Sequence, residues 1–262
     1  MDLHLTGKVA VVTGASRGIG LAVVRALAAE GVRVVAGARN VGGDLAELSE
    51  DGAVRPVAVD LATVDGPARL IDAAVEAFGR IDLLVNNVGA VRPRPGGFLD
   101  IPDEAWAETL NINFLAHVRT VRAAWPHLCA TGNAAVVTIA SVNAALPDPL
   151  VIDYSAAKAA LVNFSKALSK EGGPKGVRCN TISPGPVSTD LWLGDGGVAA
   201  TLARDRGGDP GQIAEGAARQ SVTGRFTEPE EVAALVLYLA GDLAANVTGA
   251  NFAVDGGLLT SL

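Results

Sequence analysis

The chain has 262 residues, of which 49% are hydrophobic and 19% charged, and its formal net charge is −7. A chain of this length and apolar content can bury a large core, which excludes extensive disorder. No apolar run approaches the roughly 18 residues of a membrane-spanning helix, and the N-terminal sequence does not have the pattern of a secretory signal. We therefore expect no membrane association.

The charge distribution and the cysteine content indicate which partners and which cellular compartment to expect. No cluster of Lys or Arg forms a cationic stripe, so we expect no nucleic-acid partner. The two cysteines, Cys129 and Cys179, predict no disulfide framework and favour a cytoplasmic location.

Short apolar runs alternate with longer Ala-rich helical patterns along the whole chain. The predicted strands are Val9–Thr13, Arg33–Gly37, Val54–Val59, Ile81–Asn86, Ala135–Ala140, Val177–Ser183 and Asn251–Val254. The predicted helices are Ile19–Glu30, Pro67–Phe78, Asp103–Thr131, Tyr154–Gly172 and Pro229–Leu239. Strands that are apolar throughout suit a parallel sheet covered on both faces, and the β-then-α order requires crossover connections. We predict one α/β domain over residues 1–262, a Rossmann-type doubly wound parallel sheet of about seven strands.

Two segments interrupt this alternation. Residues 89–102 contain prolines and glycines where a helix cannot start, and residues 186–223 are rich in Gly and Asp with only a weak helical pattern. Both follow predicted strands, at the sheet edge where ligands bind in α/β folds. We therefore predict that residues 187–223 form a substrate loop, because long loops in compact domains usually carry function.

The first predicted strand leads into the turn Thr13-Gly14-Ala15-Ser16-Arg17-Gly18-Ile19-Gly20 and then into a helix. This order directs backbone N–H groups and the helix dipole toward a phosphate. Gly14 permits the tight turn, Gly18 allows close approach of the backbone to a ligand, and Gly20 allows close packing of helix on strand. The structural alternative is a helix start that merely needs glycines.

The same turn contains Gly14-Ala15-Ser16-Arg17-Gly18, which matches the GxSxG nucleophile elbow of α/β-hydrolases. That chemistry needs a base histidine late in the chain, but the three histidines are His4, His117 and His127. A hydrolase is therefore disfavoured. The histidines and cysteines also lack metal-ligand spacing, so we expect no metal site, and His117 and His127 are interpreted as ordinary members of a helix.

The end of the second predicted strand indicates which dinucleotide could bind. An NAD-selective fold places an acid there to bind the ribose hydroxyls, whereas this chain has Arg39 and no acid. Arg39 and Arg17 could together bind a 2′-phosphate, because a guanidinium pairs two phosphate oxygens at once. The sequence therefore favours NADP(H) over NAD(H), the alternative being that both arginines are solvated surface charges.

A second constellation suggests proton transfer. Ser141 ends the fifth predicted strand, and Tyr154 is followed four residues later by Lys158, a spacing that places both side chains on one helix face. An ammonium near a phenol favours the phenolate, so Lys158 is expected to lower the pKa of Tyr154. The chain's other tyrosine, Tyr238, lies in an apolar helical run and is interpreted as a core residue.

Taken together, the motifs TGASRGIG at 13–20, Asn86-Asn87-Val88-Gly89, Ser141, Tyr154-x-x-x-Lys158 and Pro184-Gly185 resemble the short-chain dehydrogenase/reductase family in its compact single-domain branch. The resemblance extends from Lys8 to Gly257, and Val88 replaces the alanine that is commoner in the Asn-Asn motif. It implies that Tyr154 donates the proton in reduction and accepts it in oxidation, and that Ser141 orients the substrate carbonyl. It also implies that Lys158 lowers the pKa of the phenol and holds the nicotinamide ribose.

The resemblance further assigns Asn113 as the fourth catalytic residue, which fixes a water between Lys158 and solvent; Asn111 is its rival for that role. It implies that Asp60 lies by the adenine, that Asn87 and Gly89 flank the adenosine ribose, and that Thr189 meets the carboxamide. Asn86 and Asn87 could instead mainly stabilise the sheet. The full set expected to contact the cofactor is Gly14, Ser16, Arg17, Gly18, Ile19, Gly20, Arg39, Asp60, Leu61, Asn87, Gly89, Tyr154, Lys158, Pro184, Gly185, Val187 and Thr189.

The expected substrate is a partly apolar carbonyl compound or secondary alcohol. Its site is predicted to include Val142, Asn143, Leu146, Leu150, Leu191 and Trp192, while Arg92 and Arg94 are candidates to bind an acidic group or are simply solvated. Two alternatives remain open: a reductase of 3-oxoacyl groups on a carrier protein, and a protein that senses NADPH without turnover. The family resemblance also implies a homotetramer or homodimer.

Overall fold

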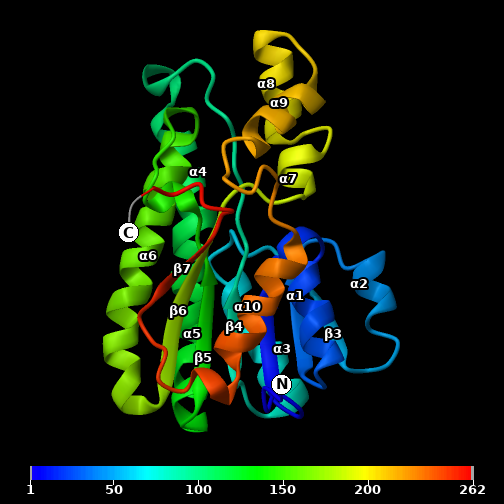
Figure 1. The fold of residues 1–262 in the computed structure, drawn as a ribbon. Helices are drawn as coiled ribbons and strands as arrows, with labels where there is room; N and C mark the ends of the chain where they lie inside the picture. The colour runs from blue at the N-terminus through cyan, green and yellow to red at the C-terminus, as the bar shows by residue number, and fades with distance from the viewer. Residues whose placement is uncertain (1, 261–262) are drawn as a thin grey trace.

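The computed structural model describes residues 2–260 and contains a seven-stranded sheet with helices on both faces (Figure 1). The strand order is β3-β2-β1-β4-β5-β6-β7, and every neighbouring pair is parallel. The strands are β1 (Val9–Thr13), β2 (Arg33–Ala38), β3 (Val54–Ala58), β4 (Leu83–Asn86), β5 (Ala134–Ile139), β6 (Val177–Pro184) and β7 (Asn251–Val254). The predicted doubly wound parallel sheet is confirmed, and its order reverses between β1 and β4.

The longer helices form two layers. On one face α1 (Gly18–Ala29) and α10 (Pro229–Ala240) pack against alternate strand residues such as Ala10 and Val12. On the other face α3 (Gly66–Phe78), α5 (Ala116–Thr131) and α6 (Ile152–Gly172) cover Val11 and Val35. Because successive strand residues point to opposite faces, the two buried sets make two cores that together cover the sheet. The short α2 (Asp44–Glu47) follows β2.

The helical pattern predicted over 103–131 is confirmed in its bounds, but the helix is not α-helical throughout. The structure has α4 (Asp103–Leu110), a π-helical turn η2 (Asn111–Leu115) and then α5. The Asn113 side chain donates to the carbonyl of Thr109 at 3.0 Å, so a side chain enters the backbone ladder and widens the helix at this point. Such turns are frequent at functional sites.

Residues 187–223 are more regular than the sequence indicated. They form α7 (Asp190–Leu193), α8 (Val198–Arg206) and α9 (Pro210–Ala218), which lie together beyond the carboxyl edge of the sheet, above α1 and α10 in Figure 1. Val198 and Leu202 are buried on α8, and Asp209 caps α9 by accepting from the Gln212 N–H at 2.9 Å. We call these three helices the cap; α8 supplies its buried apolar face, whereas α7 and α9 have no fully buried residue.

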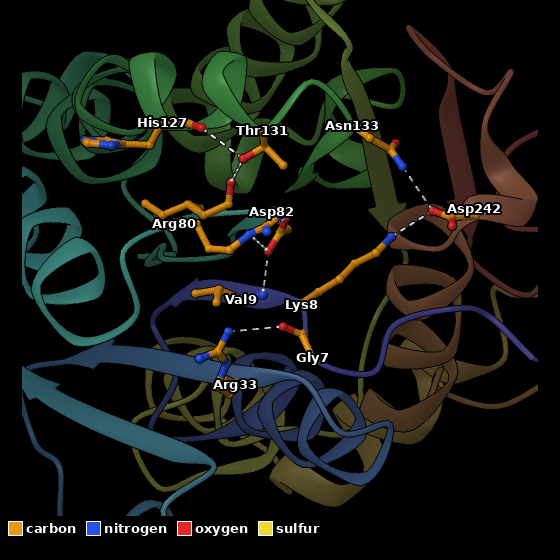
Figure 2. A network of polar contacts seen from close by, with 11 residues as sticks. Gly7, Lys8, Val9, Arg33, Arg80, Asp82, His127, Thr131, Asn133 and Asp242 are labelled. Carbon is orange, nitrogen blue, oxygen red and sulfur yellow. Dashed lines mark hydrogen bonds and ion pairs between the residues drawn. The ribbon is translucent and has the colours of Figure 1, made fainter.

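The opposite, amino edge of the sheet is closed by polar contacts (Figure 2). The buried Asp82 carboxylate accepts from the Val9 N–H at 2.8 Å and from the Arg80 guanidinium, which ties the start of β1 to β4. Lys8 and Asn133 both donate to Asp242. Because these polar side chains bind one another, we assign them a structural role in holding the segments at this edge together.

The described residues include no helix that is both long and apolar enough to cross a bilayer. Among residues 2–260, no group of three or more His, Cys, Asp or Glu side chains is arranged to hold a metal ion.

Candidate active site

A cleft of about 1360 Å³ runs along the carboxyl edge of the sheet, beneath the cap. It exceeds the roughly 300–1,000 Å³ of pockets that hold one drug-sized ligand, so it has space for an extended cofactor and a substrate together. Its walls come from the segments that follow β1 to β6, and it lies where the strand order reverses. This is the position at which doubly wound sheets bind dinucleotides.

The glycine turn forms the floor of one end of this cleft. Ser16, Arg17 and Ile19 line the cleft, and no described side chain caps the first turn of α1, which leaves its N–H groups available to an anion. Gly14 and Gly18 have φ values of 65° and 54°, a conformation that favours glycine. A Cβ on Gly20 would lie 2.1 Å from the carbonyl oxygen of Gly14. Gly20 therefore packs α1 against the turn and is not among the residues that line the cleft, so its contact with a cofactor stays a prediction.

Asn87 holds this turn in place. Its Nδ2 donates to the carbonyls of Thr13 and Gly14 at 3.0 Å each, and its own N–H donates to Thr13 Oγ1 at 2.8 Å. The Asn87 side chain therefore stabilises the edge of the sheet, which is the structural alternative given above for this motif. Asn87 also borders the cleft. The Asn86 side chain is buried beneath it with no hydrogen-bond partner among the described residues.

The residues predicted for the adenosine end of a cofactor are brought together. Arg39 is exposed at the end of β2 and lines the cleft with Asp60 and Leu61. The Asp60 carboxylate accepts from the Ala62 N–H at 2.9 Å, which fixes the turn after β3. Arg17 lies opposite, with its guanidinium 4.0 Å from the Asp190 carboxylate of α7. The guanidinium groups of Arg17 and Arg39 thus both border this end of the cleft. The end of β2 carries no acidic residue.

The other predicted cofactor contacts follow β4 and β6. Gly89, Pro184, Gly185, Val187 and Thr189 all line the cleft. A Cβ on Gly18 would lie 3.1 Å from Thr189 Cγ2, so the start of the cap sits directly against the glycine turn.

Ser141, Tyr154 and Lys158 form the opposite wall. Ser141 lies two residues beyond the end of β5, where its hydroxyl donates to Asn143 Oδ1 and accepts from the Asn143 N–H, each at 3.1 Å. Lys158 is 3% exposed, its Nζ donates to the Ile139 carbonyl at 2.8 Å and it lies 5.6 Å from the centre of the Tyr154 ring. The predicted spatial convergence of these three side chains on one ligand-sized cleft is therefore present.

The protonation behaviour of this pair differs from the expectation. Burial of the phenol raises the pKa of Tyr154 to about 12, while hydrogen bonding with Ser141 acts in the opposite direction. Burial lowers the pKa of Lys158 to about 7. Without a ligand, desolvation therefore outweighs the attraction between ammonium and phenolate, and the phenol is not acidified by the protein alone.

The structure separates the two candidate asparagines. Asn113, in η2, is fully buried; its Oδ1 accepts from the Ala90 N–H at 3.0 Å and its Nδ2 donates to the Ala90 carbonyl at 2.9 Å. A Cβ on Gly89 would lie 2.9 Å from Asn113 Oδ1 and 3.7 Å from Lys158 Nζ, so Asn113 lies close to Lys158. Asn111 lines the cleft instead, and its Nδ2 donates to the Ala62 carbonyl.

His117 is a neighbour of this site that the sequence reading treated as an ordinary helix residue. It is fully buried one helical turn beyond Asn113, with Nε2 2.6 Å from the Val88 carbonyl. Burial and the nearby Lys158 charge lower its pKa to about 3, so it is neutral and supports the loop after β4. The spacing Asn113-x-x-x-His117, which places both on one helix face, was the available signal.

The substrate end of the cleft lies between the cap and η3 (Val142–Ala144). All of the predicted side chains are present: Val142, Asn143, Leu146, Leu150, Leu191 and Trp192. The cap adds Leu202, Arg206 and Ile213, and the turn after α9 adds Gln220. One predicted role is wrong: Tyr238 is 36% exposed on the outer surface of α10 and is not a core residue.

Comparison with known proteins agrees with this geometry. Residues 14–259 match the family model described as Enoyl-(Acyl carrier protein) reductase. A D-threitol dehydrogenase of Mycolicibacterium smegmatis is 38% identical over 98% of this chain and 94% of its own length. An L-rhamnose 1-dehydrogenase (NAD(P)(+)) of Azotobacter vinelandii is 34% identical over 98% of this chain and 99% of its own length. The crystal structure of L-sorbose reductase from Gluconobacter frateurii, complexed with NADPH and L-sorbose, superposes with a TM-score of 0.91 at 35% identity over 100% of both chains.

Proposed function

The chain belongs to the short-chain dehydrogenase/reductase family, whose members act on CH–OH and C=O groups, and we propose that it transfers a hydride between NADP(H) and a small carbonyl compound or secondary alcohol. One observation carries the proposal. Ser141, Tyr154 and Lys158 line one wall of a cleft whose other end is the glycine turn with its uncapped helix.

When bound, the nicotinamide supplies or accepts the hydride. Gly14, Ser16, Gly18 and Ile19 would hold the pyrophosphate at the N-terminus of α1, and Lys158 would donate to the nicotinamide ribose. In reduction the Ser141 hydroxyl donates to the substrate oxygen, and Tyr154 transfers its phenolic proton to the same oxygen. In oxidation the Tyr154 phenolate accepts the proton of the alcohol.

The pKa values of the protein without a cofactor give Lys158 a defined electrostatic role. A hydrogen bond from Lys158 to an acceptor favours its charged form, and that charge in turn favours the phenolate of Tyr154. Binding of the cofactor would thereby move the Lys158 pKa up from about 7 and the Tyr154 pKa down from about 12. The acid–base pair would become functional only when the cofactor is present.

The preference for NADP(H) is supported by Arg39 and Arg17. Both border the cleft, and no carboxylate stands at the end of β2 to accept from ribose hydroxyls. The L-sorbose reductase is an NADPH complex, and the L-rhamnose dehydrogenase is named for both cofactors. Arg39 would distinguish the two cofactors, since only NADP(H) has a 2′-phosphate for it to bind.

The similar proteins act on polyols and sugars, and the cleft has polar groups for such substrates beside its apolar wall. Asn143, Arg206 and Gln220 could bind hydroxyl groups, while Leu146 and Trp192 exclude water. A 3-oxoacyl carrier substrate is the alternative; Thr131-Gly132-Asn133 before β5 lacks the basic residue that carrier-dependent members have there. A sensor without turnover has no use for the Ser–Tyr–Lys set.

The proposal extends to a homotetramer or homodimer in the cytoplasm. The edge strand β7 has exposed residues at alternate positions, which a second copy could cover. Cys129 and Cys179 are both free thiols, which suits a reducing compartment.

The test is NADPH oxidation with a panel of ketoses, alicyclic ketones and a 3-oxoacyl thioester. Tyr154→Phe should retain NADPH affinity and lose most turnover, while the matched control Tyr238→Phe, on the far surface of α10, should behave as wild type. Turnover by Tyr154→Phe at the wild-type rate would overturn the proposal. NADPH binding without reduction of any compound would favour the sensor.

A further inference from the structure

A buried ion pair connects the loop after β4 to the start of α6. Arg94 Nη2 lies 2.6 Å and Arg94 Nε 3.1 Å from Asp153 Oδ2. The Arg94 and Asp153 side chains are only 16% and 2% exposed. The Arg94 N–H also donates to the Leu150 carbonyl at 2.7 Å. Arg94 is therefore not free to bind an acidic substrate, as the sequence had suggested for it.

Asp153 is the residue immediately before Tyr154, and both of its carboxylate oxygens are engaged. Oδ2 also accepts from Thr109 Oγ1 of α4 at 2.8 Å, and Oδ1 accepts from the Tyr154 N–H at 2.9 Å. Burial by itself raises the pKa of Asp153, but the hydrogen bonds from Arg94, Thr109 and the Tyr154 N–H outweigh it and lower the pKa. Asp153 therefore remains a carboxylate.

The same contacts continue to Asn113. The Thr109 carbonyl accepts from Asn113 Nδ2 at 3.0 Å, and Asn113 holds both the N–H and the carbonyl of Ala90. The loop after β4 is thus fixed at Ala90 by Asn113 and at Arg94 by Asp153. Thr109 belongs to both attachments, so one hydrogen-bonded network joins Asn113 to the backbone of Tyr154.

This network borders the cleft on two sides. Val91 and Arg92 of the loop and Leu150 and Val151 before α6 all line the substrate end. A buried ion pair adds little net stability, because desolvation offsets the attraction between the charges. Two N–H groups of the planar guanidinium on one carboxylate oxygen, together with the Arg94 N–H on the Leu150 carbonyl, instead define one relative position of the two segments.

We propose that Arg94 and Asp153 are positioning residues, which hold the Tyr154 hydroxyl and the substrate-facing loop in the geometry needed for proton transfer. The proposal rests on the function proposed above. Neither residue touches the reacting atoms; each acts through the placement of the first turn of α6. A displacement of about 1 Å in such a site can reduce the rate on the order of 100-fold.

The test compares kcat and the NADPH dissociation constant across graded variants, using the panel compound that is reduced fastest. Arg94→Gln should lower kcat about 10- to 100-fold and leave NADPH affinity unchanged. Arg94→Lys keeps the positive charge but not the planar guanidinium with its two donors, so its kcat should fall less than that of Arg94→Gln. The double variant Arg94→Gln/Asp153→Asn should have a higher kcat than Arg94→Gln, because it no longer contains a buried carboxylate without its cationic partner. The exposed pair Arg25–Asp44 is the matched control, and Arg25→Gln should change neither quantity.

Thr109→Val is the variant that changes the network least. If Arg94→Gln does not fold, Thr109→Val still tests the positioning role. It removes one hydrogen bond to Asp153 and should lower kcat several-fold. A readout without substrate comes from ¹³C-labelled tyrosine, since the chain has 2 tyrosines. In Thr109→Val the NMR signal of Tyr154 should shift while that of Tyr238 stays in place.

Wild-type kcat in both Thr109→Val and Arg94→Lys, with an unmoved Tyr154 signal, would overturn the positioning role. So would a loss of NADPH affinity by the same factor as kcat, because that pattern indicates general damage. Full activity of Tyr154→Phe would instead refute the proposed function itself. If Tyr154→Phe is inactive and the network variants are wild type, only the positioning role fails.

Discussion

Burial of the Lys158 amine predicts how the stability of the cofactor-free protein depends on pH. The amine donates to the Ile139 carbonyl, and burial lowers its pKa from 10.5 to about 7. The unfolded chain keeps the Lys158 proton up to about pH 10.5, whereas the folded protein releases it near pH 7. The unfolded state therefore binds more protons between these values, and the free energy of unfolding rises with pH in that window.

The magnitude follows from the same two values. At about 1.4 kcal/mol per pKa unit, the whole window is worth about 5 kcal/mol, of which about 2 kcal/mol falls between pH 7 and pH 9. Burial raises the pKa of Cys179 from 9.0 to about 12 and that of Tyr154 from 10.0 to about 12, so both groups lower stability mainly above pH 9. The interval from pH 7 to pH 9 isolates Lys158.

Urea unfolding of the cofactor-free protein at several pH values measures this slope. Lys158→Met should remove most of the increase and should stabilise the protein at pH 7. Lys170→Met, a change of an exposed lysine on the same helix α6, should leave the slope as in wild type. An unchanged slope in Lys158→Met, or wild-type stability that falls between pH 7 and pH 9, would refute this assignment of a desolvated amine.

Two further substitutions test the cofactor end of the cleft. Gly20→Ala would place a Cβ 2.1 Å from the Gly14 carbonyl and should abolish NADPH binding, whereas Gly42→Ala, with nothing within 4 Å of its Cβ, should bind NADPH normally by fluorescence titration; normal binding by Gly20→Ala would show that the turn adapts. Arg39→Ala should weaken NADPH binding by about 1.5–3 kcal/mol, the contribution of a hydrogen bond to a charged group, and leave NADH binding unchanged. Equal losses for the two cofactors would mean that Arg39 does not bind the 2′-phosphate.

The sheet and most of the cleft were predictable because their signals are local. Uninterrupted β-branched runs and glycine turns report secondary structure directly, and the carboxyl ends of parallel strands must meet at one edge. Ser141, Tyr154 and Lys158 follow from that rule together with the i,i+4 spacing on α6.

The features that sequence reading missed depend on contacts between distant segments. Arg94 and Asp153 are 59 residues apart, and nothing near either one indicates its partner. Asn113 of the π-helical turn η2 binds Ala90, 23 residues away, while the residues of the turn continue a helical pattern in the sequence. Tyr238 was assigned to the core from apolar neighbours, but α10 turns it outward.

The pKa values were missed for a different reason. The i,i+4 spacing shows that Lys158 is near Tyr154 but not how deeply each is buried. Desolvation is set by the whole fold, and here it outweighs the attraction between the two charges.

The most direct measurement for the account as a whole is a crystal structure of the protein with NADP⁺ and a bound alcohol or ketone. We expect the nicotinamide beside Lys158, with the substrate oxygen about 2.6–3.2 Å from both the Tyr154 and the Ser141 hydroxyl. A nicotinamide bound away from this wall of the cleft, or a substrate oxygen out of hydrogen-bond reach of Tyr154, would contradict it.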